Sequence, residues 1–88
     1  MPTCFKNMPS LEKIKAALLD SAKDHSHRFG TVVHFLEATG WNQRIKGGHH
    51  IFTRPGIPIL LNLQPEKSGK AKAYQIAQVR KQLELFQL

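Results

Sequence analysis

Residues 44–56 read RIKGGHHIFTRPG, and this stretch is the most informative part of the chain. Gly47-Gly48 lies between two runs in which polar and apolar residues alternate, a pattern typical of two strands joined by a hairpin turn. Pro55-Gly56 marks a second tight turn, and residues 57–63 follow as a third strand. Pro58 indicates that this third strand lies at a sheet edge or begins after the proline. The stretch therefore predicts a three-stranded meander.

The segments on either side of the meander have the periodicity of helices. Ser10 is a suitable N-cap for a helix over residues 10–23, and a second, shorter helix is expected to stop at Gly40. Apolar residues recur at helical spacing again over residues 76–86. The predicted order is α-α-β-β-β-α, an α+β fold of three antiparallel strands packed on helices. Such a sheet leaves its second face open to solvent or ligand.

The charge of the chain is distributed unevenly. The 88 residues suit one domain and carry a formal net charge of +7. Residues 41–81 hold eight Lys and Arg side chains against Glu66 alone, and no carboxylate lies between Glu37 and Glu66. A basic half fits nucleic acid first, an acidic protein second and an anionic membrane surface third. Further features must decide among these partners.

Cysteine content and hydropathy bear on the compartment. The single Cys4 cannot form an internal disulfide, which favours a reducing cytoplasm. No apolar run approaches the roughly 20 residues of a membrane-spanning helix, and the first ten residues lack the apolar core of a secretion signal. We therefore expect a soluble cytoplasmic protein without a membrane partner.

The hairpin and its flanks resemble a known family. Gly40-Trp41 followed by the basic strand and Gly-Gly-His-His-Ile-Phe at residues 47–52 resembles the HicA toxin family, and the similarity continues through residues 62–64 and 69–75. The resemblance covers residues 28–88, which leaves residues 1–27 as an N-terminal extension with an extra helix. It implies a double-stranded-RNA-binding-like fold and a small endoribonuclease that cleaves messenger RNA, restrained by a HicB-like antitoxin.

The same resemblance assigns roles within the turn. The catalytic histidine of the family maps onto His50, and Gly48 stands where the family has serine. His49 is the second choice for the proton carrier.

Two hairpin registers are possible, and they give the histidines different surroundings. A two-residue loop at Gly47-Gly48 would mix polar and apolar residues on both faces of the hairpin. A three-residue loop over residues 46–48 keeps the basic residues together, and we expect this second register. The helix-covered face would then hold Trp41, Ile45, His49 and Ile51, and the wet face Arg44, His50, Phe52 and Arg54.

These residues suggest RNA cleavage without a metal ion. Such cleavage uses the ribose 2′-hydroxyl as nucleophile, so the protein supplies a proton carrier, here His50, and cations for the phosphate. The predicted RNA-binding residues are Arg44, Lys46, Phe52, Arg54, Lys67, Lys70 and Lys72, with Phe52 as a stacking platform. Neither a cofactor nor a metal is expected, since adjacent histidines point to opposite faces of a strand.

Two non-catalytic alternatives remain open at this stage. One is an RNA-binding module, and the other is an interaction subunit whose basic face serves an acidic antitoxin-like protein.

Overall fold

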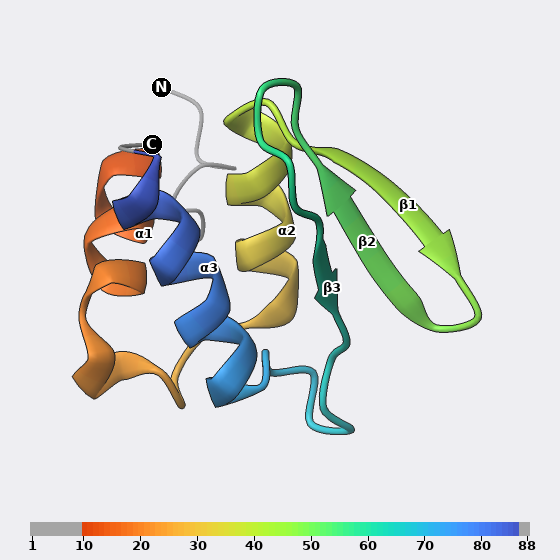
Figure 1. Cartoon of the computed structure of the whole chain (residues 1–88). Helices are drawn as coiled ribbons and strands as arrows, with labels where there is room; N and C mark the ends of the chain where they lie inside the picture. Colours follow the sequence, from red (N-terminus) through yellow and green to blue (C-terminus); the bar gives the residue numbers. More distant parts are fainter. Residues whose placement is uncertain (1–9, 87–88) are drawn as a thin grey trace, which may run out of the picture.

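The computed structural model describes residues 10–86, so the prediction that concerns Cys4 lies outside the described residues. Within this range three α-helices and a three-stranded antiparallel sheet follow in the order α-α-β-β-β-α, which confirms the predicted α+β fold class (Figure 1). The elements are α1 (Leu11–Leu19), the short 3₁₀ turn η2 (Ser21–Lys23), α2 (Phe29–Ala38), β1 (Asn42–Lys46), β2 (His49–Thr53), β3 (Leu61–Leu63) and α3 (Ala73–Leu85).

The first helix is shorter than the predicted 10–23. Its start is as expected, because the Ser10 side chain accepts a hydrogen bond from the Lys13 amide at 3.3 Å. The helix ends at Leu19 because Asp20 is extended and its carboxylate accepts from the Ala22 amide at 3.0 Å. Asp20 thus caps a new 3₁₀ turn instead of continuing α1.

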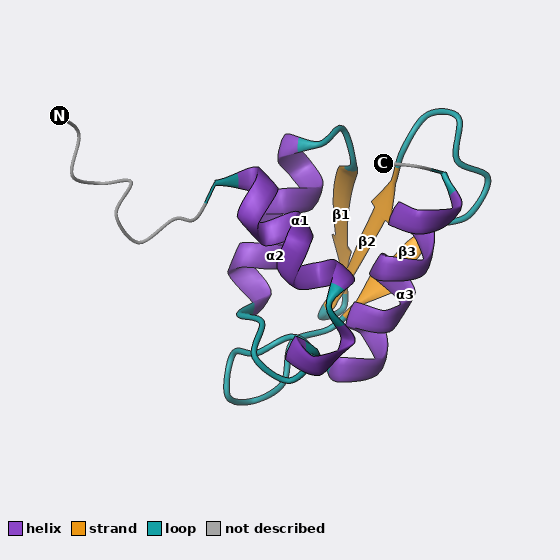
Figure 2. Cartoon of the chain, turned by 90° about the vertical axis from the view of Figure 1, so that its left-hand side faces the viewer, coloured by secondary structure: helices purple, strands orange, loops and turns teal. Residues whose placement is uncertain are grey.

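The helices and the sheet form adjacent layers. Helices α2 and α3 lie against the sheet, and α1 packs on both of them on the side away from the strands (Figures 1 and 2). Buried apolar side chains from every layer form one core. They include Ile14 and Leu18 of α1, so this helix of the N-terminal extension enlarges the core. None of the helices between residues 10 and 86 is long and apolar enough to cross a membrane.

The β1–β2 hairpin has a two-residue turn, so the predicted three-residue loop is wrong. Lys46 pairs with His49, Ile45 with His50, and Gln43 with Phe52. Gly47 and Gly48 have φ angles of 56° and 85°. Positive φ at both central residues is what a type I′ turn requires, and this turn matches the twist of the flanking strands.

This register mixes polar and apolar residues on both faces, as expected for a two-residue loop: Ile51 lies beside Arg44 on the face away from the helices, and His50 lies beside Ile45 on the helix side. The tip of the hairpin projects beyond the helices (Figure 1). Ile45 therefore lies on the helix side of the sheet yet remains 63% exposed. The turn geometry of two glycines decided the register, and the segregation of polarity did not.

The third strand is also shorter than the predicted 57–63. Pro55-Gly56 forms a turn in which the Ile57 amide donates to the Arg54 carbonyl at 3.1 Å, and Pro58 lies in the following loop. Strand β3 begins after this proline, at Leu61, as one of the two expectations for Pro58 required.

Candidate functional site

One face of the sheet is left uncovered by the helices that the structure describes between residues 10 and 86. The register places seven side chains on it, and we call this surface the open face: Asn42, Arg44, Lys46, His49, Ile51, Thr53 and Asn62. All of them are exposed except Ile51, which is half-buried at the centre. The face carries two permanent cations and one imidazole, and none of its side chains is acidic.

His49 lies on the open face with a fixed ring orientation. Its Nδ1 lies 3.1 Å from Oδ1 of Asn62 on β3. An amide oxygen only accepts, so this contact favours the tautomer with the proton on Nδ1, in which the neutral ring has its lone pair on Nε2. Lys46 lies directly opposite His49, and Arg44 is the next residue along the same face. Directly opposed residues have Cβ atoms about 4.5–5.5 Å apart, so the ammonium group can reach a phosphate held beside the imidazole.

His50 lies on the opposite side of the sheet, and the prediction that it faces solvent beside Arg44 is wrong. It pairs with Ile45 and with Leu63, which belong to the helix side. Its Nδ1 lies 2.7 Å from Oε1 of Gln43, and its ring meets that of Phe29 edge to face at a centroid distance of 4.8 Å. A one-residue shift of register turns every side chain of a strand to the other face, which is why the two histidines exchange surroundings.

The same shift turns Phe52 away from the predicted RNA-binding surface, and Arg54 lies just beyond the end of the strand. Phe52 is fully buried in the core, so it cannot be a stacking platform. Arg54 lies at the far end of β2 from His49, and its side chain runs across Gly40 at the end of α2. Its Nε lies only 3.3 Å from the position that a Cβ at Gly40 would take. Arg44 and Lys46 remain exposed on the open face, as predicted.

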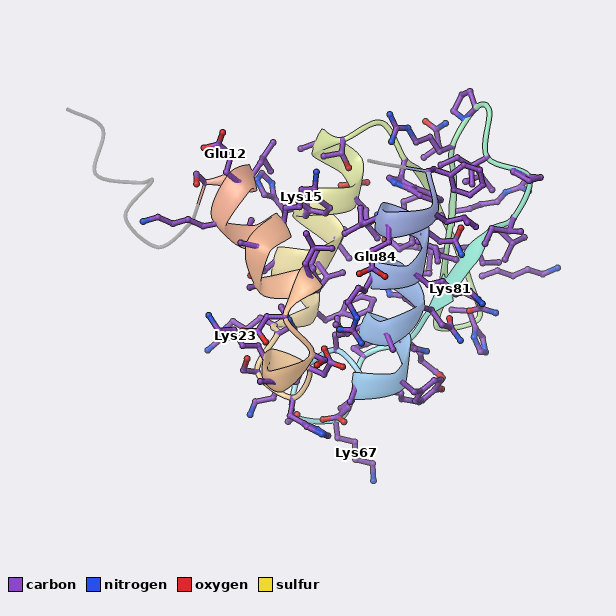
Figure 3. The ribbon with its side chains drawn as sticks, turned by 60° about the vertical axis from the view of Figure 1, so that its left-hand side comes forward. Glu12, Lys15, Lys23, Lys67, Lys81 and Glu84 are labelled. Carbon is purple, nitrogen blue, oxygen red and sulfur yellow. The ribbon has the colours of Figure 1, made fainter. Side chains whose placement is uncertain are left out.

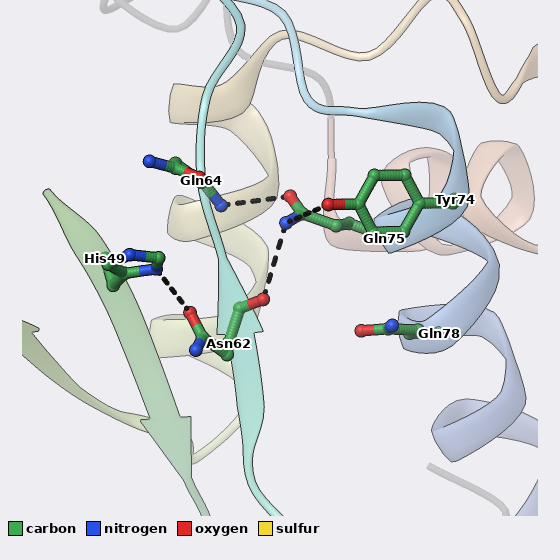
Figure 4. Close-up of a pocket in the computed structure, with 6 residues that line it drawn as sticks. All are labelled: His49, Asn62, Gln64, Tyr74, Gln75 and Gln78. Carbon is green, nitrogen blue, oxygen red and sulfur yellow. Dashed lines mark hydrogen bonds between the residues drawn. The ribbon is translucent and has the colours of Figure 1, made fainter.

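A shallow polar groove extends the open face past the edge of β3. It has a volume of about 200 Å³ and lies between the strands and the first turns of α3 (Figure 4). Its lining residues are His49, Asn62, Gln64, Tyr74, Gln75 and Gln78.

Gln75 builds the floor of this groove and is only 5% exposed. Its Oε1 accepts from the Gln64 amide at 2.9 Å, and its Nε2 donates to the Asn62 carbonyl at 3.4 Å. Its side chain thereby takes the place of a neighbouring strand along the free edge of β3.

The three predicted lysines lie in the connection between β3 and α3. Lys72 is nearest the groove, where its Nζ lies 3.4 Å from Oε1 of Gln64. Lys67 and Lys70 are exposed in the tight loop before it, and Lys67 points away from the body of the molecule (Figure 3). This loop lies at the same end of the molecule as the hairpin tip (Figure 1). Lys72 and Lys46 therefore flank the His49 region, whereas Lys67 lies further out.

Sequence reasoning missed five of the groove residues: Asn62, Gln64, Tyr74, Gln75 and Gln78. The sequence does contain a pattern that links two of them: Tyr74 and Gln78 are four residues apart on a helix, so they lie on the same helix face. Among residues 10–86, no three His, Cys, Asp or Glu side chains come together in a way that could hold a metal ion.

Comparison with known proteins gave no relatives. No family model, no curated protein and no solved structure matches the chain. The likeness to HicA toxins therefore rests on the motif residues alone.

Proposed function

We propose that this protein is a metal-independent endoribonuclease of the kind represented by HicA toxins, with His49 as its proton carrier. The observation that carries the proposal is the position of His49: exposed on the open face, oriented by Asn62, and flanked by Lys46 and Arg44. The role first assigned to His50 thus passes to its neighbour.

The proposed step is attack by the ribose 2′-oxygen on the adjacent phosphorus. Nε2 of His49 takes the proton of the 2′-hydroxyl while the new O–P bond forms. The bond from phosphorus to the 5′-oxygen breaks, and the leaving oxygen takes a proton from water. Arg44 and Lys46 offset the negative charge that grows on the phosphate oxygens. The products are a 2′,3′-cyclic phosphate and a 5′-hydroxyl.

An RNA-binding module without catalysis is the second candidate. It is favoured by one observation, namely that His49 is the only imidazole, carboxylate or thiol among the described residues that line the groove. A binding module would show salt-dependent RNA affinity without scission.

The deciding experiment incubates single-stranded RNA with the protein in excess chelator and follows the cyclic phosphate product. We expect cleavage by the wild type and a loss of roughly 10²- to 10⁴-fold in rate for His49→Ala, the range that general acid–base catalysis contributes. Equal rates for the two proteins would remove His49 from the mechanism, and the absence of products from the wild type would leave the binding module.

His50→Ala is the matched control, because it removes the same group from the other side of the same strand. We expect it to retain cleavage per folded molecule, although loss of the contacts to Gln43 and Phe29 lowers its stability. DNA of the same sequence lacks the 2′-hydroxyl and should remain uncut. In cells, the toxin reading predicts growth arrest on expression of the wild type, relieved by His49→Ala or by a HicB-like antitoxin.

A further inference from the structure

The groove beside His49 contains more than a nuclease needs for its phosphate chemistry. Three of its side chains are amides with hydrogen-bonding groups to spare. The Gln78 amide has no hydrogen bond within the part of the chain that the structure describes, and Gln64 and Asn62 each use one oxygen and keep their NH₂ groups free. Amides both donate and accept, as do the edges of nucleobases.

Tyr74 adds an aromatic surface at the rim of the groove. Its side chain is 61% exposed although it belongs to a well-packed helix, and its hydroxyl lies 3.5 Å from Nε2 of Gln75 (Figure 4). Exposed aromatic rings beside a basic track are the usual stacking platforms for unpaired bases. Phe52 was expected to supply such a ring, but its place in the core leaves this role open.

The size and charge of the groove narrow the class of ligand. Its volume of about 200 Å³ is below the roughly 300–1,000 Å³ of sites for drug-sized ligands, so it suits a single flat ring. Its lining holds no carboxylate and no Lys or Arg, whereas Lys46, Arg44 and Lys72 lie around it. Charge therefore surrounds a neutral polar centre, as a base flanked by backbone phosphates requires.

We propose that this groove is a nucleobase subsite, in which Tyr74 stacks on one unpaired base of an RNA strand and the amides of Gln64 and Gln78 contact its edge. The buried Gln75 fixes the floor, and His49 at the groove wall is adjacent to the sugar of the bound nucleotide. This inference rests on the proposed function in taking RNA as the ligand. It implies that single-stranded RNA is bound in preference to duplex, because a paired base cannot enter the groove.

The test separates base binding from charge and from catalysis. A labelled 2′-O-methyl RNA of mixed sequence, which lacks the nucleophile and stays intact, is titrated with the full-length protein. An abasic oligomer with the same number of phosphates is titrated in parallel. We expect the wild type to bind the base-bearing strand about 5- to 150-fold more tightly, the value of one stacked base. Tyr74→Ala should lose most of this ratio, and Tyr74→Phe should keep it.

Leu85→Ala is the control for removing a large exposed side chain. Leu85 is 63% exposed on the same helix, about 16 Å further along its axis, and its replacement should leave the ratio unchanged. Equal affinities of the wild type for the two oligomers, or an unchanged ratio in Tyr74→Ala, would overturn the subsite. The cleavage assay is independent of this titration. If the protein prefers the base-bearing strand but cleaves no RNA, the nucleobase subsite stands and the nuclease proposal fails. If it cleaves RNA but shows no such preference, the nuclease proposal stands and the subsite fails.

Discussion

At the scale of single residues, the hairpin that positions His49 depends on the backbone of Gly48. Its φ of 85° lies in the left-handed region, while a Cβ added there would meet no atom within 4 Å. A side chain at this position would therefore destabilise the fold through backbone strain and not through a steric clash. Gly48→Ala should lower the free energy of unfolding by about 1–2 kcal/mol. Urea unfolding measures this change.

Gly30 provides a control of opposite sign. It lies inside α2 without positive φ and with equally open space, so Gly30→Ala should leave stability unchanged or raise it by up to about 1 kcal/mol. Destabilisation of similar size in both variants would contradict the account of the turn.

The residue scale is also where prediction from the sequence was weakest. Arg44 and Lys46 were placed correctly, because their wet face follows from the alternation along β1 alone. The roles of His49 and His50 depended on the pairing between two strands, and a single residue of register exchanges them. Polarity patterns argued for one register and the two glycines for the other. The two glycines set the register, and mixed faces are the result: Ile45 is 63% exposed at the projecting tip, and Ile51 is half-buried among polar side chains.

At the scale of secondary-structure elements, the contact between α3 and β3 depends on Gln75. This one side chain serves both a donor and an acceptor on the free edge of β3. Gln75→Leu leaves both without a partner, and we expect a loss of about 1–3 kcal/mol in the free energy of unfolding. Gln78→Leu, three residues further along α3 and exposed, should change stability by no more than about 0.5 kcal/mol.

A comparison of the two variants by urea unfolding isolates the edge contact from helix propensity, since both replace glutamine by leucine. Equal stabilities would mean that solvent satisfies the hydrogen-bonding groups at the edge of β3 as well as Gln75 does.

The sequence could not reveal this contact between α3 and β3. Periodicity places Gln75 next to the apolar stripe of α3, but only the packed structure shows which strand its amide meets.

At the scale of the whole molecule, the element order and the fold class could be predicted from the sequence, because they depend on the spacing of apolar residues and on the turn residues along the chain. What the sequence did not show was how the N-terminal segment is held to the last helix. The Arg80 guanidinium donates to both carboxylate oxygens of Asp24, at 2.7 and 3.2 Å, and also to the Leu18 carbonyl. This hydrogen bonding to Arg80 lowers the pKa of Asp24 below its ordinary value of 3.8. The stability that the pair contributes is therefore present above about pH 3.8 and is lost only as the pH falls further.

A second pH dependence, at milder acidity, arises from His27 in the same region. Its side chain is only 6% exposed, and its Nε2 has no hydrogen-bond partner among the described residues. Burial lowers the pKa of His27 below 6.5, an effect that nearby Asp24 partly offsets and that Lys23 and Arg80 reinforce. The unfolded chain therefore binds this proton more readily than the folded one, and stability should fall as the pH drops below about 6.5.

The urea midpoint, measured in steps from pH 8 down to about pH 5, tests this expectation. His27→Gln keeps a polar side chain of similar size that does not titrate, so its midpoint should be lower at pH 8 or unchanged, but less dependent on pH than that of the wild type. The difference between the two slopes isolates His27 from the other four histidines of the chain. Its sign follows from burial, because Nε2 is buried and meets no acceptor among the described residues, which disfavours the charged imidazole in the folded state. Parallel slopes for the two proteins would show that His27 is protonated as easily in the core as in the unfolded chain. Any loss of stability between pH 8 and about pH 5 would then come from other residues.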